Sequence, residues 1–297
     1  MDPFDPRPLA QMLRRATEPV AFWFRHEILG PRHPEVVAGR PALAAAPLRR
    51  ETERQQRHEG HWGTHLHPET GEPEVDSLRL YTNLRLLADY GATAGDEPVA
   101  HALEALWSLQ IVDGRFPLYW HHMGHLLVTL ARLGQAGDQR VQRLDALLRR
   151  EQRADGGWLN PLYEPRVTVQ GGPSCVWTTV NVVLGLLAGA QAGPDPVLER
   201  AAGFLEATIL TPGYRSFCYG GMEPWQTLHY GYRGIRFFVG PHLVLDALSC
   251  LGATRYGEPL ARLWVATMAQ RRPDGWWGDA WTTLTIWRVA ARLHSHD

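Results

Sequence analysis

The sequence predicts an all-α fold, a ring of helical hairpins with about 5–6 inner and about 5–6 outer helices. The first observation is a short pattern that recurs along the chain, best seen in Gln152-Arg153-Ala154-Asp155-Gly156-Gly157-Trp158. The second observation is that the helical segments around these patterns alternate between polar and apolar composition. A fold with one solvated and one buried layer of helices explains both observations.

The recurring pattern indicates the end of a helix. Its glycine can take the left-handed conformation that ends helices, and its aromatic side chain has a large apolar face that can anchor the turn. We expect the anchoring aromatics to be structural. Four clear copies are present, at 56–62, at 110–116 with Phe116 in place of tryptophan, at 152–158, and at 270–277 with one extra residue. A degenerate fifth copy is expected at 211–214.

Apolar periodicity places helices between and around these copies. Asp76 and Ser77 are expected to cap the third of them. The segment 61–74 is expected to be a loop, and Gly240-Pro241 is expected to break the ninth helix. The expected helices span 8–29, 42–59, 78–91, 97–110, 119–133, 138–152, 175–188, 196–209, 228–251, 256–271 and 279–293.

Length and composition favour one domain over 1–297, with an N-terminal helix and connector in 1–44 and hairpin repeats in 45–293. The net charge of −1 lacks the electrostatic footprint of a nucleic-acid binder. All basic side chains other than histidine are arginine, which excludes a Schiff-base lysine. Three cysteines, no signal-peptide pattern and no apolar run long enough to cross a membrane favour the cytoplasm.

Repeated helix ends of the form Gln-x-x-Asp-Gly-x-Trp resemble those of the terpene cyclase and protein prenyltransferase β-subunit superfamily. The resemblance covers about residues 45–293 and implies an α/α toroid with its site in a central cavity, near the start of the inner helices. The Asp-x-Asp-Asp and Asp-Asp-x-x-Asp motifs of the cyclases and synthases are absent. The chain more closely resembles short, stand-alone bacterial members described only as prenyltransferase-like.

Aligning the expected inner helices from their ends places several polar residues at one level. The candidate catalytic residues there are Asp76, His121, His122, Cys175 and Asp279. We expect at least three of these five to line one pocket, because titratable groups beside apolar walls mark functional sites. The candidate substrate-binding residues are Trp120, His125, Trp177, Arg233, Arg236, His242 and Trp281.

These substrate-binding candidates have different expected roles. The tryptophans are expected either to stabilise a carbocation over their rings or simply to fill the core. His121 and His125 share a helix face, where they can bind a metal or pass protons. The arginines belong to an aromatic-rich insertion at 214–236, expected to be either a lid that binds an anionic group or a surface loop.

Zinc is a possible cofactor, because the resemblance implies a zinc-binding cysteine near the start of an inner helix. Cys175 has that place, but Pro173 replaces the aspartate that precedes the family's cysteine. His229 or His242 would be the later ligand, and Asp279 would be a distant carboxylate ligand. The alternative is that Cys175 packs as a small apolar side chain.

Two functions remain open at this stage. One is an enzyme of the cyclase, isomerase or transferase type, which acts by acid–base catalysis on a hydrophobic, isoprenoid or polycyclic molecule. The other is a non-catalytic toroid that holds a hydrophobic ligand or docks on another protein. The sequence identifies neither the substrate nor the oligomeric state.

Overall fold

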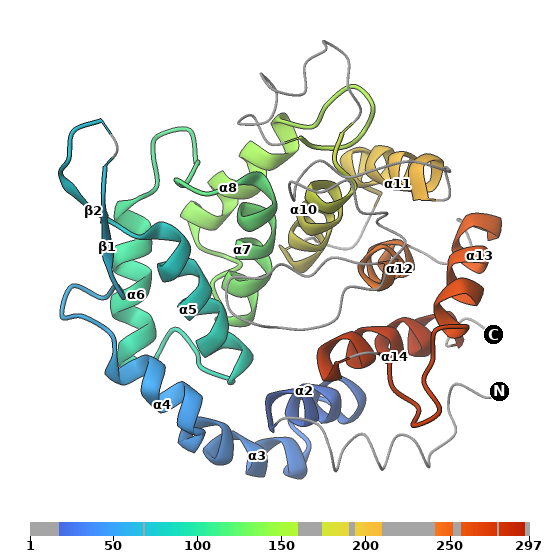
Figure 1. Ribbon diagram of the computed structural model, residues 1–297, viewed down its shortest axis with the longest axis horizontal. Coiled ribbons are helices and arrows are strands. Elements are labelled where there is room, and N and C mark those ends of the chain that lie inside the picture. Colours follow the sequence, from blue (N-terminus) through green and yellow to red (C-terminus); the bar gives the residue numbers. More distant parts are fainter. Residues whose placement is uncertain are drawn as a thin grey trace. The chain divides into compact units, whose positions relative to one another are not determined.

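The structure is a computed structural model that describes residues 18–67, 69–159, 174–189, 194–209, 241–251, 257–277 and 279–294. These residues form twelve helices and one two-stranded sheet (Figure 1). The chain divides into two compact units, which we describe separately. The first unit comprises Ala16–Leu118 and Leu126–Leu147, and the second includes Tyr119–His125 and Leu148–Asp297. The expectation of a single domain stays a prediction.

The first unit holds most of the elements before residue 147. They are α2 (Glu18–Leu29), α3 (Pro34–Ala45), α4 (Pro47–Arg54), β1 (Thr64–Leu66), β2 (Pro73–Val75), α5 (Ser77–Asp89), α6 (Glu97–Ser108), and most of α7 (Trp120–Arg132) and α8 (Gln139–Arg150). Within it, α2 packs on α3 and α5 packs on α6 (Figure 1).

The second unit holds the first turns of α7 and the C-terminal helices. These are α10 (Val176–Gly189), α11 (Pro196–Ile209), α12 (Pro241–Cys250), α13 (Gly257–Met268) and α14 (Ala280–His294). In this unit α12 packs against both α10 and α14 (Figure 1). Ten of the fourteen residues of α10 are buried, whereas α13 has only three buried residues. The predicted alternation between apolar and half-exposed helices is therefore confirmed for this pair.

The recurring pattern forms the same turn in all four copies. Its glycine has a positive φ each time, +82° at Gly60, +96° at Gly114, +89° at Gly156 and +89° at Gly275. An added Cβ at Gly114 would lie 2.6 Å from the carbonyl oxygen of Arg143, on α8. Glycine is thus required both by the backbone conformation and by the close approach of that helix.

The glutamine of the pattern joins its turn to the second helix that follows it in the chain. The side-chain amide of Gln152 donates to the carbonyl oxygens of Gly156 and Val197, each at 2.8 Å. Gln56 and Gln110 make the equivalent pair of bonds, to the first turns of α6 and α8. The residue type is explained by this geometry, because one amide nitrogen supplies two donors.

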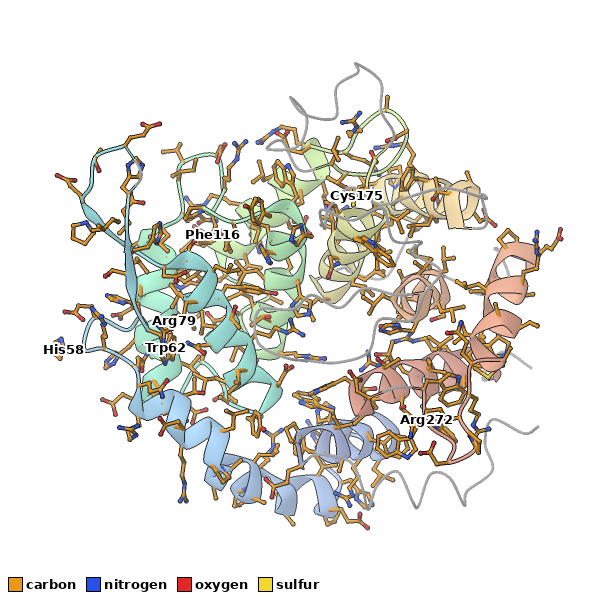
Figure 2. The ribbon with its side chains drawn as sticks, viewed as in Figure 1. His58, Trp62, Arg79, Phe116, Cys175 and Arg272 are labelled. Carbon is orange, nitrogen blue, oxygen red and sulfur yellow. The ribbon has the colours of Figure 1, made fainter. Side chains whose placement is uncertain are left out.

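The pattern's tryptophans are structural, as predicted. Trp158 is 1% exposed, and its Nε1 donates to the carbonyl oxygen of Leu148, ten residues earlier, at 2.7 Å. Trp62 and Trp277 repeat this bond with Thr52 and Thr267. Each buried indole therefore has a partner for its only donor. In the first unit Arg79 packs against Gly63, the residue after Trp62, while His58 of the same turn is exposed (Figure 2).

Three local predictions were wrong. The expected helix over 42–59 is two helices, because Pro47 forces Ala46 into an extended conformation with ψ 133°. The expected loop at 61–74 contains the antiparallel pair β1 and β2, with Thr64 opposite Val75. The fourth copy has no extra residue, because Arg271 takes the place of the glutamine and donates to the carbonyl oxygen of Gly275 at 3.3 Å.

Some predictions lie outside the described residues. These are the helical turns before residue 18, the degenerate copy at 211–214, the insertion at 214–236 and the first part of the expected helix 228–251. Among the described residues, no helix is both long and apolar enough to cross a membrane.

Candidate functional site

The starts of four apolar helices are equivalent in the structure. The residue before each helix accepts a hydrogen bond at its carbonyl oxygen from the amide four residues later. This residue is Asp76 before α5, Tyr119 before α7, Cys175 before α10 and Asp279 before α14, with distances of 2.9–3.1 Å. The alignment of helix starts is thus correct for three of them. In α7 the equivalent residue is Tyr119, and the two histidines lie within the first turn.

Two of the candidate carboxylates cap their helices. Asp76 accepts from the amide of Arg79 at 2.9 Å, and Asp279 accepts from the amide of Thr282 at 2.7 Å. Both side chains are half-buried. Asp76 belongs to the first unit, whereas the other four candidate catalytic residues belong to the second.

A cluster of three rings lies at the start of α7. His121 and His122 are 3% and 1% exposed, and their ring centroids are 4.3 Å apart. The ring of Tyr119 stacks on His121 at 5.6 Å and lies at the same distance from His122. Burial lowers the pKa of His121 to about 3, because a charged imidazolium loses its hydration there. His121 is therefore a neutral imidazole at physiological pH.

His242, in the first turn of α12, is a second buried imidazole. It is 1% exposed, and burial lowers its pKa to about 4, although the nearby carboxylates of Asp279 and Asp246 act in the opposite direction. Neither ring nitrogen has a hydrogen-bond partner among the described residues. Asp279 and His242, two candidates from different helices, are thus close enough to interact electrostatically.

A buried ion cluster connects α12 with α14. Asp246 is 4% exposed and accepts hydrogen bonds from Arg292 at 2.6 Å and from Arg288 at 3.3 Å. Arg292 also donates to Ser249 at 2.9 Å. Sequence reasoning missed this cluster, although an aspartate within the apolar run 243–248 and two arginines four residues apart were visible signals.

Cys175 is held at the start of α10 by the third copy of the pattern (Figure 2). Its amide donates to the carbonyl oxygen of Trp158 at 2.9 Å, and its side chain is buried. The preceding Ser174 donates to the carboxylate of Asp155 through its amide at 2.8 Å and through its hydroxyl at 2.7 Å. The repeat turn therefore fixes both residues that precede α10, Ser174 and Cys175.

A zinc site does not form from the expected ligands. No three His, Cys, Asp or Glu side chains in the described ranges lie together in a way that could hold a metal ion. Cys175, His242 and Asp279 all fall within those ranges, so this structure gives the zinc set no support.

The remaining candidates are placed as follows. Trp120 and Trp177 are buried at the first and second positions of α7 and α10, while Trp281 and His125 are half-buried. Arg233 and Arg236 lie outside the described residues. The sharing of one pocket by at least three of the five candidates stays a prediction.

The fold can now be compared with known proteins. No model of a protein family matches the chain, and no curated protein matches its sequence. Among solved structures, a polysaccharide lyase aligns with a TM-score of 0.57 and 10% identity over 95% of this chain and 91% of the lyase. The chain therefore has an all-α fold of the α/α toroid class, as predicted.

More distant alignments involve a cyclase. The type II terpene cyclase MstE from Scytonema aligns at a TM-score of 0.29 and 16% identity, over 81% of this chain and 80% of the cyclase. A variant of that cyclase in complex with geranylgeranyl dihydroxybenzoate aligns at 0.31 and 15%, over 85% of this chain and 98% of the cyclase. At these TM-scores, and at identities of 10–16% for all three structures, the function has to be argued from the residues themselves.

Proposed function

We propose that the chain is an enzyme that transfers a proton to or from a hydrophobic, isoprenoid or polycyclic small molecule. The proposed acid–base groups are His121 and His122, with Asp279 and Cys175 from the same unit as further candidates. The observation that carries the proposal is the buried, adjacent pair of imidazoles at the start of an apolar helix, of which His121 stacks on Tyr119.

The burial of this pair argues for a functional role. Leucine or methionine would fill the same space without the desolvation cost of an imidazole, which is why buried polar groups usually have a specific use. A lowered pKa keeps His121 neutral, and a neutral imidazole has a lone pair that can accept a proton. The pair therefore combines proton-accepting capacity with apolar surroundings.

The low basicity of His121 favours one kind of reaction. A carbocation is so acidic that a weak base removes its proton: the C–H electron pair becomes the new C=C bond, and the proton moves to the imidazole. Trp120, Trp177 and Trp281 lie at the starts of α7, α10 and α14, and tryptophan is a residue type that stabilises cations over its π face. A terminating deprotonation of this kind fits a cyclase, an isomerase or a transferase.

The likeness in fold to a polysaccharide lyase supports a second candidate, eliminative cleavage of a polysaccharide. Removing a proton from carbon needs a base of substantial strength, and a carboxylate on the sugar would need a cation to neutralise it. A base with a pKa of about 3 is poorly matched to this task, and Arg288 and Arg292 are already bound to Asp246. These observations rank the second candidate below the first.

One experiment separates these functions from simple ligand binding. Native mass spectrometry of the purified protein identifies any bound lipid, and the protein is then incubated with polyprenyl diphosphates, squalene-like polyenes and polyuronates. We expect products from the isoprenoid substrates, losses of at least about tenfold in His121→Gln and His122→Gln, and no change in His58→Gln, an exposed control.

Other results would overturn the proposal. Unsaturated oligosaccharides from the polyuronates would support the second candidate. A bound lipid without turnover, retained equally by Asp76→Asn and His122→Ala, would support a non-catalytic ligand-binding or docking toroid. We also propose the cytoplasm as the compartment, on the strength of the cysteine usage alone.

A further inference from the structure

Two glycines bring α7 and α10 into backbone contact in the second unit. A Cβ added at Gly124 would lie 2.6 Å from both the Cα and the amide nitrogen of Val182. A Cβ added at Gly185 would lie 2.9 Å from the carbonyl carbon of Gly124 and closer still to its oxygen. Because the opposing atoms belong to the backbone, no side-chain rotation could relieve either clash.

This contact is unusual among the helical glycines of the same unit. Gly189, at the end of α10, and Gly203, in α11, have nothing within 4 Å of an added Cβ. Glycine weakens a helix relative to alanine, so a glycine within a helix calls for a local reason. At Gly124 and Gly185 the reason is the close approach itself.

The contact lies next to the histidine pair. His121 precedes Gly124 by three residues and therefore lies on the same side of α7, one turn closer to its start. Side chains on a helix lean toward its N-terminus, so residues near Gly124 cover the surface beside the first turn. The separation of α7 from α10 at Gly124 thus sets how much room is left around His121.

We propose that Gly124 and Gly185 are positioning residues of the histidine site, which hold the first turn of α7 against α10 and so keep water from the two imidazoles. The inference rests on the proposed function, because it gives the contact a purpose in proton transfer. A methyl group at Gly185 would force the two backbones apart by roughly 1 Å before ordinary van der Waals separation is reached. Water would then gain access to the first turn.

The test measures the ionisation of the histidines directly, so it does not depend on turnover. Protein labelled with ¹³C at histidine is titrated by NMR, and the His121 resonance is assigned by its loss in His121→Gln. We expect Gly185→Ala to raise the pKa of His121 by about one unit or more, since hydration stabilises the charged form. Gly189→Ala, in the same helix, should leave this pKa unchanged.

An internal reference and a second variant distinguish a local change at His121 from a change that affects the whole protein. His26, in the other unit, should titrate alike in all variants, and Gly124→Ala should act in the same direction as Gly185→Ala. The proposal is overturned if the pKa of His121 is equal in Gly185→Ala and Gly189→Ala. It is also overturned if Gly185→Ala fails to fold even in sucrose, which favours compact states, because the glycines would then serve the fold and not the site.

A failure of the proposed function would look different. In that case the pKa of His121 would still rise in Gly185→Ala, but no substrate of the panel would be turned over. The two ideas are therefore tested separately.

Discussion

The buried imidazoles of His121 and His242 should make the protein sensitive to mild acid. Their pKa values are lowered to about 3 and about 4, whereas an unfolded chain binds a proton near pH 6.5. Below pH 6.5 these two histidines bind protons in the unfolded state but not in the folded state, so the free energy of unfolding falls as the pH falls. The stabilisation is fully present above pH 6.5 and is lost on the way down to the folded pKa values.

The size of the effect follows from the shifts. Each pH unit below 6.5 costs about 1.4 kcal/mol for each histidine, so at about pH 4.5 the two together cost roughly 5 kcal/mol. Typical domains are stable by only about 5–15 kcal/mol, so acid should remove a large part of the total.

Urea unfolding between pH 7 and pH 4.5 measures this loss. We expect His121→Gln and His242→Gln each to reduce the loss over this interval by about 2–3 kcal/mol, because glutamine cannot be protonated. His58→Gln, at an exposed position, should follow the wild-type curve. If His121→Gln has the same pH dependence as wild type, His121 is not a buried neutral imidazole, and the basis of the proposed site is lost.

Three further predictions concern the scaffold, and each can be checked by chemical denaturation at pH 7. Trp158→Ala should cost about 3–5 kcal/mol, and Trp158→Phe, which mainly removes the bond to the carbonyl of Leu148, about 1 kcal/mol; wild-type stability in Trp158→Ala combined with lost activity would make it a site residue. Gly156→Ala should cost more than about 1 kcal/mol, because φ is +89° and a Cβ would clash with the carbonyl of Arg200; an unchanged midpoint would contradict this account. Asp246→Asn should cost about 3 kcal/mol, since it leaves arginines of α14 without their carboxylate; a neutral result would mean that solvent compensates them.

The sequence was informative where structure is determined locally. The ends of the helices were predictable because a glycine with positive φ and a following aromatic produce the same turn in every copy. The break between the two helices at Ala46 is also local, because the residue before a proline is disfavoured in the helical conformation. The prediction of one continuous helix over 42–59 followed the apolar pattern and overlooked Pro47. Arg271 was missed as a substitute for glutamine because its role depends on donor geometry and not on similarity of residue type.

The candidate site was less predictable, because its residues meet only through packing. Counting back from helix ends placed Asp76, Cys175 and Asp279 at equivalent positions. The capping role of Asp76 was predicted and is confirmed, but the same counting did not show that Asp279 caps its own helix. Long-range ion pairs such as that between Asp246 and Arg292 leave no periodic trace in a single sequence.

The hydrogen bonds of Gln56, Gln110 and Gln152 form a joint between one hairpin and the next, and this joint has a consequence for how such a chain can change in length. In each joint the glutamine amide donates to a backbone carbonyl oxygen of the next hairpin, such as that of Val197. In two of the joints an arginine of that hairpin, Arg143 or Arg200, also donates to the Oε1 of the glutamine. A carbonyl is present whatever the residue, so the bond that all three joints share needs no matching side chain on the receiving helix. A duplicated hairpin would therefore arrive with this shared bond to its successor, and a family of these chains could gain or lose hairpins with few paired changes at the joints.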